Sequence, residues 1–275
     1  GIMLHGTVGL QHAAMGIYNA WCDRVPMMIF AGNGVDANTR RPGVEWFHSG
    51  QDPAAMVREF VKWDDQPLSL PHFAESVVRA HKIAMTAPME PVMITCDMDL
   101  QEEPIEHPEK LKIPRVTRPS HPQGDTAALR EAAKLLVGAT NPVIIADRAA
   151  RSQDGVKRIV ELAESLGAPV VDLGGRVNFP GTHDLDLSFL RLSLVRDADV
   201  ILLLEVADPW GSVHSFSDPY REIRRLAKPD AKIISISMLE VYIKANFQDF
   251  QRFLPVDLAI GGDVETSLPD LIDAV

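Results

Sequence analysis

Residues 1–30 read GIMLHGTVGLQHAAMGIYNAWCDRVPMMIF, and this stretch decides the fold. Its first residues, Gly1–Leu4, are small or apolar and predict a strand. Val8–Cys22 carries apolar side chains at helical spacing, and Pro26–Phe30 is a short apolar run of the kind that forms buried parallel strands. The stretch therefore predicts a β-α-β unit, for which a right-handed crossover is expected.

The same alternation of apolar runs and helical periodicity continues to about residue 100. We expect a helix over Ala54–Glu59, a short strand over Phe60–Trp63, a helix over Leu70–Thr86 and a strand over Pro91–Cys96. The periodicity then stops, because five prolines fall between Glu102 and Asp125 and each fixes its φ angle and lacks an amide donor. This region predicts an extended linker.

A second alternating set follows the linker. It comprises helices at 126–138, 155–166 and 264–274 and strands at 142–146, 169–173, 200–204 and 232–237. Gly138 and Gly167 each stand at an expected helix end with a proline shortly beyond, which is typical of helix termination. The sequence thus predicts an α/β protein of two parallel-sheet domains, the second of them Rossmann-like.

Composition and charge exclude several classes of protein. The chain has 275 residues, 46% of them hydrophobic, and a net charge of -11 without a stripe of lysine and arginine, so nucleic acid is not an expected partner. No apolar run approaches the roughly 18 residues that span a bilayer, so we expect a soluble, cytoplasmic protein without a membrane partner. Cys22 and Cys96 lie in apolar segments without metal-ligand spacing and are interpreted as reduced, buried thiols. Because Gly1 opens a strand with no turn before it, we interpret the chain as a piece of a longer protein.

The common short catalytic motifs are missing from the sequence. The Gly32-Asn-Gly34 run lacks the third glycine of the dinucleotide fingerprint, and no P-loop, HExxH, GxSxG or EF-hand pattern occurs. Two histidines occupy more suggestive positions. His5 follows the first strand, at the edge where open α/β sheets bind ligands, and His183 lies in the loop after the expected strand at 169–173. Position alone leaves a capping role for His5, and a solvated loop position for His183, as alternatives.

The run from Leu4 to Trp21, with Leu-His, a glycine loop, Ala-Met-Gly and Asn-Ala-Trp in this order, resembles the pyrimidine-binding domain of thiamine-diphosphate enzymes of the benzoylformate decarboxylase and acetolactate synthase kind. The later part of the chain resembles the central Rossmann-like domain of that family through Pro142–Ile145, Asn178–Pro180 and Ala198–Leu202. The resemblance implies three regions: residues 1–101 as the C-terminal part of the pyrimidine-binding domain, 102–125 as linker and 126–275 as central domain.

The resemblance also implies a chemistry. It makes His5 and His183 the proton-transfer groups of a 2-oxo acid decarboxylase, and it places cofactor contacts at Gly6, Gly9 and Gln11. Thiamine diphosphate would supply the carbanion and hold the electrons released on cleavage, and histidine suits proton transfer near neutral pH. Magnesium and the diphosphate are held in that family by a Gly-Asp-Gly motif that this sequence does not contain. The resemblance further implies a homodimer or homotetramer of the longer parent, and it suggests that this chain alone is inactive.

Two alternatives remain at this point. The first is an acetolactate-synthase-like carboligase or lyase of the same superfamily, some members of which carry FAD. Against FAD, Ala146-Asp147-Arg148 stands where a glycine-rich strand end is expected. The second alternative is a non-catalytic nucleotide-binding or oligomerisation module.

Overall fold

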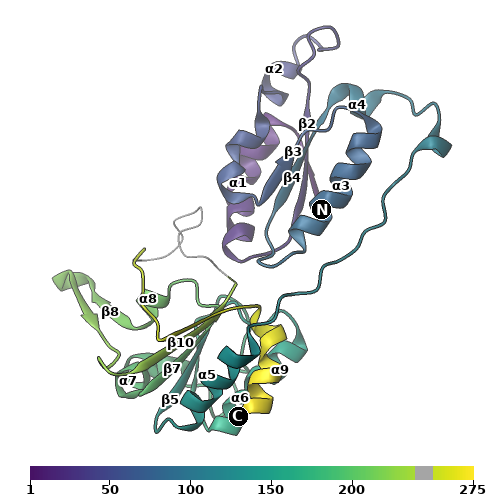
Figure 1. Cartoon of the computed structure of the whole chain (residues 1–275). Coiled ribbons are helices and arrows are strands. Elements are labelled where there is room, and N and C mark those ends of the chain that lie inside the picture. The colour runs from purple at the N-terminus through teal and green to yellow at the C-terminus, as the bar shows by residue number, and fades with distance from the viewer. Residues whose placement is uncertain (239–249) are drawn as a thin grey trace. The chain divides into compact units, whose positions relative to one another are not determined.

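The computed structural model describes residues 1–238 and 250–275 (Figure 1). It divides into two compact units, Gly1–Ser120 and His121–Val275, and the division falls inside the proline-rich stretch. Both main sheets are parallel α/β sheets, as the sequence predicts. The assignment of residues 1–101, 102–125 and 126–275 to particular domains stays a prediction.

The first unit has a four-stranded parallel sheet in the order β1-β2-β4-β3. Its strands are β1 (Ile2–Leu4), β2 (Met28–Asn33), β3 (Trp63–Asp65) and β4 (Val92–Asp97). Helices of this unit are α1 (Thr7–Cys22), α2 (Glu45–His48), α3 (Leu70–Ala84) and α4 (Met98–Glu102). The side chains of α1 pack with Ile29 and Met93 on one face of the sheet, while those of α3 pack with Val92 and Ile94 on the other. β2 and β4 are therefore covered on both faces, which explains their largely apolar sequences.

The structure corrects the sequence prediction between residues 53 and 65. The expected helix over Ala54–Glu59 is two 3₁₀ turns, Pro53–Met56 and Arg58–Phe60, and the strand expected over Phe60–Trp63 is β3, shifted toward the C-terminus. Each 3₁₀ turn is too short to repay the cost of nucleating an α-helix, and β3 is set by its pairing with Val92–Ile94 of β4. Asp64 and Asp65 are the last two residues of β3.

The second unit has a five-stranded parallel sheet in the order β11-β10-β7-β5-β6 and a separate two-stranded antiparallel sheet, β8-β9. The strands are β5 (Pro142–Ala146), β6 (Val170–Asp172), β7 (Val200–Leu204), β8 (His214–Ser217), β9 (Glu222–Arg225), β10 (Lys232–Ser237) and β11 (Leu258–Gly261). Its helices are α5 (Thr126–Val137), α6 (Gln153–Leu166), α7 (Arg191–Asp197), α8 (Pro209–Ser212) and α9 (Val264–Ala274). Side chains of α5, α6 and α9 cover one face of the five-stranded sheet, and Val195 of α7 and Trp210 of α8 belong to the cluster on the other (Figure 1).

Helix ends in the second unit follow their local sequence. Gly167 ends α6 in the left-handed conformation, with φ 59°, as a glycine C-cap should. Gly138 also caps its helix, although its φ of -79° is one that other residues adopt as well. Among the described residues, no helix is both long and apolar enough to cross a membrane.

Candidate functional site

His5 lies directly after β1, at the carboxyl edge of the first sheet. Its side chain is exposed, and its ring lies nearly parallel to that of His48, with 4.7 Å between ring centroids and 25° between planes. His48 ends α2 and also contacts Phe47, whose ring centroid is 4.1 Å away. The fold thus brings together two histidines that lie far apart in the sequence.

Both histidines line a cavity of about 280 Å³. Its walls come from the segments that follow β1, β2 and β4: His5, Gly6, Gly32, Asn33, Arg41, Val44, Glu45, His48, Ser49, Met98, Gln101 and Glu102. The carboxyl ends of parallel strands are where open α/β sheets bind ligands, because the loops diverge there and leave a crevice. This cavity is therefore the candidate functional site of the first unit.

Asn33 is the most buried polar side chain of the cavity wall that still has hydrogen-bonding capacity. It ends β2, is 5% exposed, and its Oδ1 accepts a hydrogen bond from the backbone N–H of Gly50 at 3.1 Å. Its Nδ2 donates to no described residue. A buried amide donor without an acceptor costs roughly 1–3 kcal/mol, so the cavity wall is suited to a ligand oxygen.

The two acidic side chains of the cavity share one arginine. Glu45 is buried, and its carboxylate accepts hydrogen bonds from Arg41 Nε at 3.1 Å and from Ser49 Oγ at 3.2 Å. Arg41 also pairs with Glu102, with 3.3 Å between Nη2 and Oε1. One positive and two negative groups leave a single excess negative charge in this lining.

The structure separates the three residues for which the resemblance implies cofactor contacts. Gly6 lines the cavity, and a Cβ at this position would overlap the carbonyl oxygens of His48 and Gly32, so only glycine fits the present backbone. Gly9 packs against Leu4 within α1, and Gln11 is exposed on the same helix. Gly9 and Gln11 do not line the cavity, and their cofactor contacts stay predictions.

His183 has a different setting in the second unit. Its Nδ1 accepts a hydrogen bond from the backbone N–H of Leu185 at 3.2 Å, its Nε2 lies 3.3 Å from Glu164 Oε1, and its ring contacts Phe179 edge-on at 4.9 Å. Glu164 belongs to the last turn of α6, and Asp186 pairs with Val170, the first residue of β6. His183 therefore lies beside the amino end of β6, whereas ligands of such sheets bind at the carboxyl end.

The loop after β5, at the carboxyl edge of the second sheet, has its backbone donors bound by side chains of the same unit. Asn178 is fully buried in the segment after β6, and its Oδ1 accepts hydrogen bonds from the backbone N–H groups of Ala149 at 2.9 Å and Ala150 at 3.1 Å. These amides lie between β5 and α6, where a dinucleotide-binding domain presents free N–H groups to a pyrophosphate. The next amide, that of Arg151, donates to Glu265 Oε2 at 2.8 Å. All three donors are therefore already occupied.

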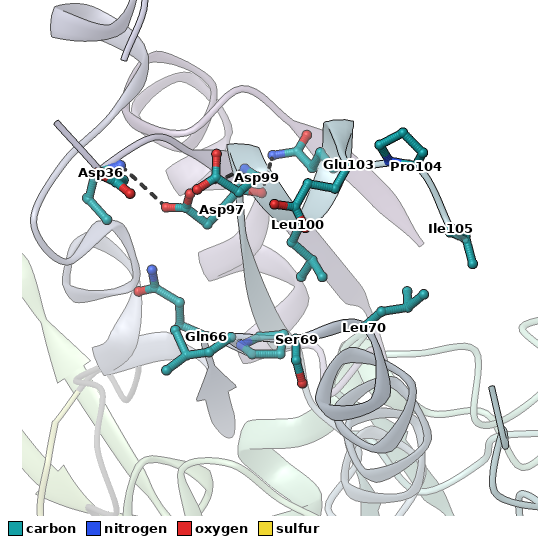
Figure 2. Close-up of a pocket in the computed structure, with 14 residues that line it drawn as sticks. Asp36, Gln66, Ser69, Leu70, Asp97, Asp99, Leu100, Glu103, Pro104 and Ile105 are labelled. Carbon is teal, nitrogen blue, oxygen red and sulfur yellow. Dashed lines mark hydrogen bonds between the residues drawn. The ribbon is translucent and has the colours of Figure 1, made fainter. Parts of the chain in front are cut away.

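A larger cavity of about 620 Å³ lies in the first unit, at the carboxyl ends of β2, β3 and β4 (Figure 2). Four carboxylates line it, those of Asp36, Asp97, Asp99 and Glu103, and no lysine or arginine does. Figure 2 shows Asp97 and Asp99 across the opening from Gln66 and Ser69. This lining would repel an anion more strongly than that of the smaller cavity, where Arg41 offsets one of two carboxylates.

Sequence reasoning missed Asn33 and His48 as site residues. Asn33 carried a signal, because it directly follows an apolar strand at the edge where ligands bind. His48 carried none, since its meeting with His5 depends on the path of the loop between β2 and α2. Among the described residues, no group of three histidine, cysteine or acidic side chains comes together as a metal site.

Comparison with known proteins identifies the family. Residues 129–271 match the model of the thiamine pyrophosphate enzyme central domain. The chain belongs to the thiamine pyrophosphate enzymes. It is 26% identical to a probable acetolactate synthase large subunit of Methanocaldococcus jannaschii, over 97% of this chain and 44% of the relative. It is 24% identical to benzoylformate decarboxylase of Pseudomonas aeruginosa, over 78% of this chain and 41% of the relative.

Solved structures agree with this membership at the level of fold. A putative thiamin diphosphate-dependent enzyme from Mycobacterium smegmatis superposes with a TM-score of 0.76 at 20% identity, over 99% of this chain and 50% of that one. The chain thus spans about half the length of the proteins it matches. The family resemblance drawn from the sequence is confirmed.

Proposed function

We propose that this chain is part of a thiamine-diphosphate-dependent 2-oxo acid decarboxylase, with His5 as a proton-transfer group. Membership of the thiamine pyrophosphate enzymes supports the cofactor. The observation that carries the proposal is the cavity at the carboxyl edge of the first sheet, where His5 and His48 stand beside the unpaired amide of Asn33. When bound, thiamine diphosphate supplies the carbon nucleophile and accepts the electron pair released on C–C cleavage.

The residues of this chain would then bind, orient and protonate. No hydrogen bond from a described residue occupies the ring nitrogens of His5, so the imidazole is free to exchange a proton with a substrate oxygen or carbon. Gly6 lets the segment after β1 lie against the backbone of Gly32 and His48, which fixes the position of His5 in the cavity wall. The proposal keeps Mg²⁺ as a second cofactor because the resemblance implies it.

We further propose that the second unit holds no flavin. The backbone N–H groups of Ala149, Ala150 and Arg151 donate to Asn178 and Glu265, so a pyrophosphate would have to displace buried partners. This supports a flavin-free decarboxylase over an FAD-carrying carboligase. A yellow full-length protein with flavin absorbance would contradict this part of the proposal.

A role for His183 in proton transfer is proposed on the resemblance alone. Its contacts with Glu164 and Phe179 support an additional, structural role. The H183A variant separates the two, because a structural histidine lowers the melting temperature, whereas a proton-transfer group lowers turnover at an unchanged melting temperature.

The carboligase reading remains the second candidate, since the match to the probable acetolactate synthase covers nearly the whole chain. A homodimer or homotetramer, a 2-oxo acid substrate and a cytoplasmic location are proposed for the parent protein on the resemblance.

A non-catalytic nucleotide-binding or oligomerisation module is the third candidate. A melting temperature that rises with ADP or coenzyme A, and not with thiamine diphosphate, would favour it.

The test is carbon dioxide release by the open reading frame that contains this chain. A panel of 2-oxo acids is assayed with thiamine diphosphate and magnesium added or omitted, for the parental sequence and for H5A. We expect cofactor-dependent release that falls at least tenfold in H5A, a barrier increase of about 1.4 kcal/mol or more. The exposed histidine of α1 gives the matched control, H12Q, which should not change turnover. Cofactor binding without release from any acid would favour carboligation.

A further inference from the structure

We propose that Asn33 and His48 form an oxygen-binding subsite that holds the carboxylate of the substrate beside His5. The identity of the ligand as a 2-oxo acid rests on the proposed function. The assignment of these two side chains rests on the cavity itself, on its unpaired donors and on the charges of its lining compared with those of the larger cavity.

The amide of Asn33 has a fixed orientation and an unused donor. Because Oδ1 accepts the N–H of Gly50, the Nδ2 group is the end of the side chain left without a partner. Asn33 lines the cavity but its Nδ2 atom is itself buried, so a ligand oxygen reaches this donor only if the cavity wall moves slightly; we assign the missing acceptor to such a ligand. The ligand must therefore present an oxygen with a free lone pair.

His48 offers a second donor in the same cavity lining. Its ring is held between those of His5 and Phe47, which restricts its rotation. No described residue hydrogen-bonds to the ring nitrogens of His48, so an N–H of the imidazole is available to a ligand oxygen. Asn33 and His48 line one cavity, and we assign their two donors to the two oxygens of a carboxylate.

The charge distribution favours an anion in this cavity over its larger neighbour. Glu45 and Glu102, the two acids of the His5 cavity, both pair with Arg41. In the larger cavity, by contrast, no basic side chain offsets the carboxylates, which include those of Asp97 and Asp99. With one excess negative charge against four, the His5 cavity opposes an anionic substrate less than the larger cavity does.

The test uses the chain as it stands, with pyruvate as the probe and its methyl ester as the uncharged control. Histidine Cε1–Hε1 resonances are followed by NMR while either compound is titrated to tens of millimolar. We expect saturable shifts of the His5 and His48 resonances with pyruvate and none with methyl pyruvate. His12, exposed on α1, is the internal control and should not shift.

Two variants assign the contacts. N33D keeps an acceptor for the N–H of Gly50 but replaces the free donor with a negative oxygen, so pyruvate binding should weaken at least about tenfold. H48F keeps an aromatic ring against His5 and removes both ring nitrogens, so binding read from His5 should weaken several-fold. H12Q should bind like the unchanged chain.

The outcomes separate this proposal from the proposed function. The subsite is refuted if pyruvate gives no saturable shift, if methyl pyruvate binds equally well, or if folded N33D and H48F both bind pyruvate unchanged. A chain that binds pyruvate through both side chains, in a parent that releases no carbon dioxide, would uphold the subsite and reject the decarboxylase. A parent that decarboxylates with an unchanged KM in N33D would do the reverse.

Discussion

Replacing Asn178 with alanine should destabilise the second unit strongly, because one buried side chain satisfies several backbone groups there. Its Oδ1 accepts the N–H groups of Ala149 and Ala150, and its Nδ2 donates to the carbonyl of Arg176 and to Asp172 Oδ1, the latter at 2.8 Å. Alanine at this position would leave both amides without an acceptor in a region where Ala149 and Ala150 are themselves buried.

The magnitude follows from those two amides. Each buried N–H that loses its acceptor costs about 1–3 kcal/mol, so the two amides together cost about 2–6 kcal/mol, and partial relaxation of the loop places the loss in the lower half of that sum. We expect N178A to lower the free energy of unfolding by about 3 kcal/mol, which for a chain of this size corresponds to a drop in melting temperature of roughly 6–12 °C. The N178D variant retains an acceptor for the amides but sets a second carboxylate against Asp172, so it should also be destabilised.

The assay is urea denaturation followed by far-UV circular dichroism, with the melting temperature as a second measure. The matched control is N141A, because Asn141 is exposed in the same unit and its bond with Asp199 uses the backbone N–H, which alanine retains. A loss in N178A below about 1 kcal/mol, no greater than in N141A, would refute the reasoning. It would mean that water or another side chain replaces Asn178 at the loop between β5 and α6.

Three further predictions concern single positions. G6A should lower the free energy of unfolding by about 1–3 kcal/mol, because its Cβ would overlap two backbone oxygens, whereas G16A, with nothing within 4 Å, should be neutral or slightly stabilising; equal effects in urea denaturation would contradict this. The hydrogen bond from Lys232 holds the pKa of Asp257 below its ordinary value, so the stability that this carboxylate contributes is present above about pH 4 and is lost as pH falls through the lowered pKa. D257N should flatten the acidic part of a curve of unfolding free energy against pH, and an unchanged curve there would count against the Lys232–Asp257 ion pair. Burial raises the pKa of the Cys96 thiol to about 11, so the folded state loses stability as pH rises above the pKa of the unfolded chain, about 8.5. Alkylation of Cys96 at pH 8, followed by mass spectrometry, should run at least about tenfold slower in the folded than in the unfolded chain.

Long periodic segments could be predicted from the sequence, because one local rule decides them. Apolar side chains recur at helical spacing from Thr7 to Cys22, and they form one uninterrupted run, typical of a buried strand, from Val200 to Leu204. The strand at Leu258–Gly261 could not be predicted this way. It is four residues long, pairs only with β10 and buries one side chain fully, so pairing rather than its own pattern makes it a strand.

The residues of the candidate site also differ in whether the sequence could predict them. His5 could be singled out because it directly follows a strand, and the carboxyl ends of parallel strands together form the edge where ligands bind. His48 could not, because its position depends on where the loop after β2 turns back toward the sheet. Gly50 shows the reason in one contact, since its N–H reaches back to Asn33 Oδ1 and returns this loop to the edge of β2.

The hydrogen-bond donors around His5 are weaker than an arginine paired only with the substrate, and this suits the proposed decarboxylation. An arginine paired only with the substrate would stabilise the carboxylate before cleavage as much as it helped binding, and such uniform binding does not speed the chemical step. Arg41 lines the cavity but is already shared by Glu45 and Glu102, which leaves a neutral amide and an imidazole to hold the acid. These two groups can orient the carboxylate while giving up little when it leaves as neutral carbon dioxide. Carbon dioxide carries no charge, so the subsite should bind it more weakly than the substrate carboxylate without a moving part.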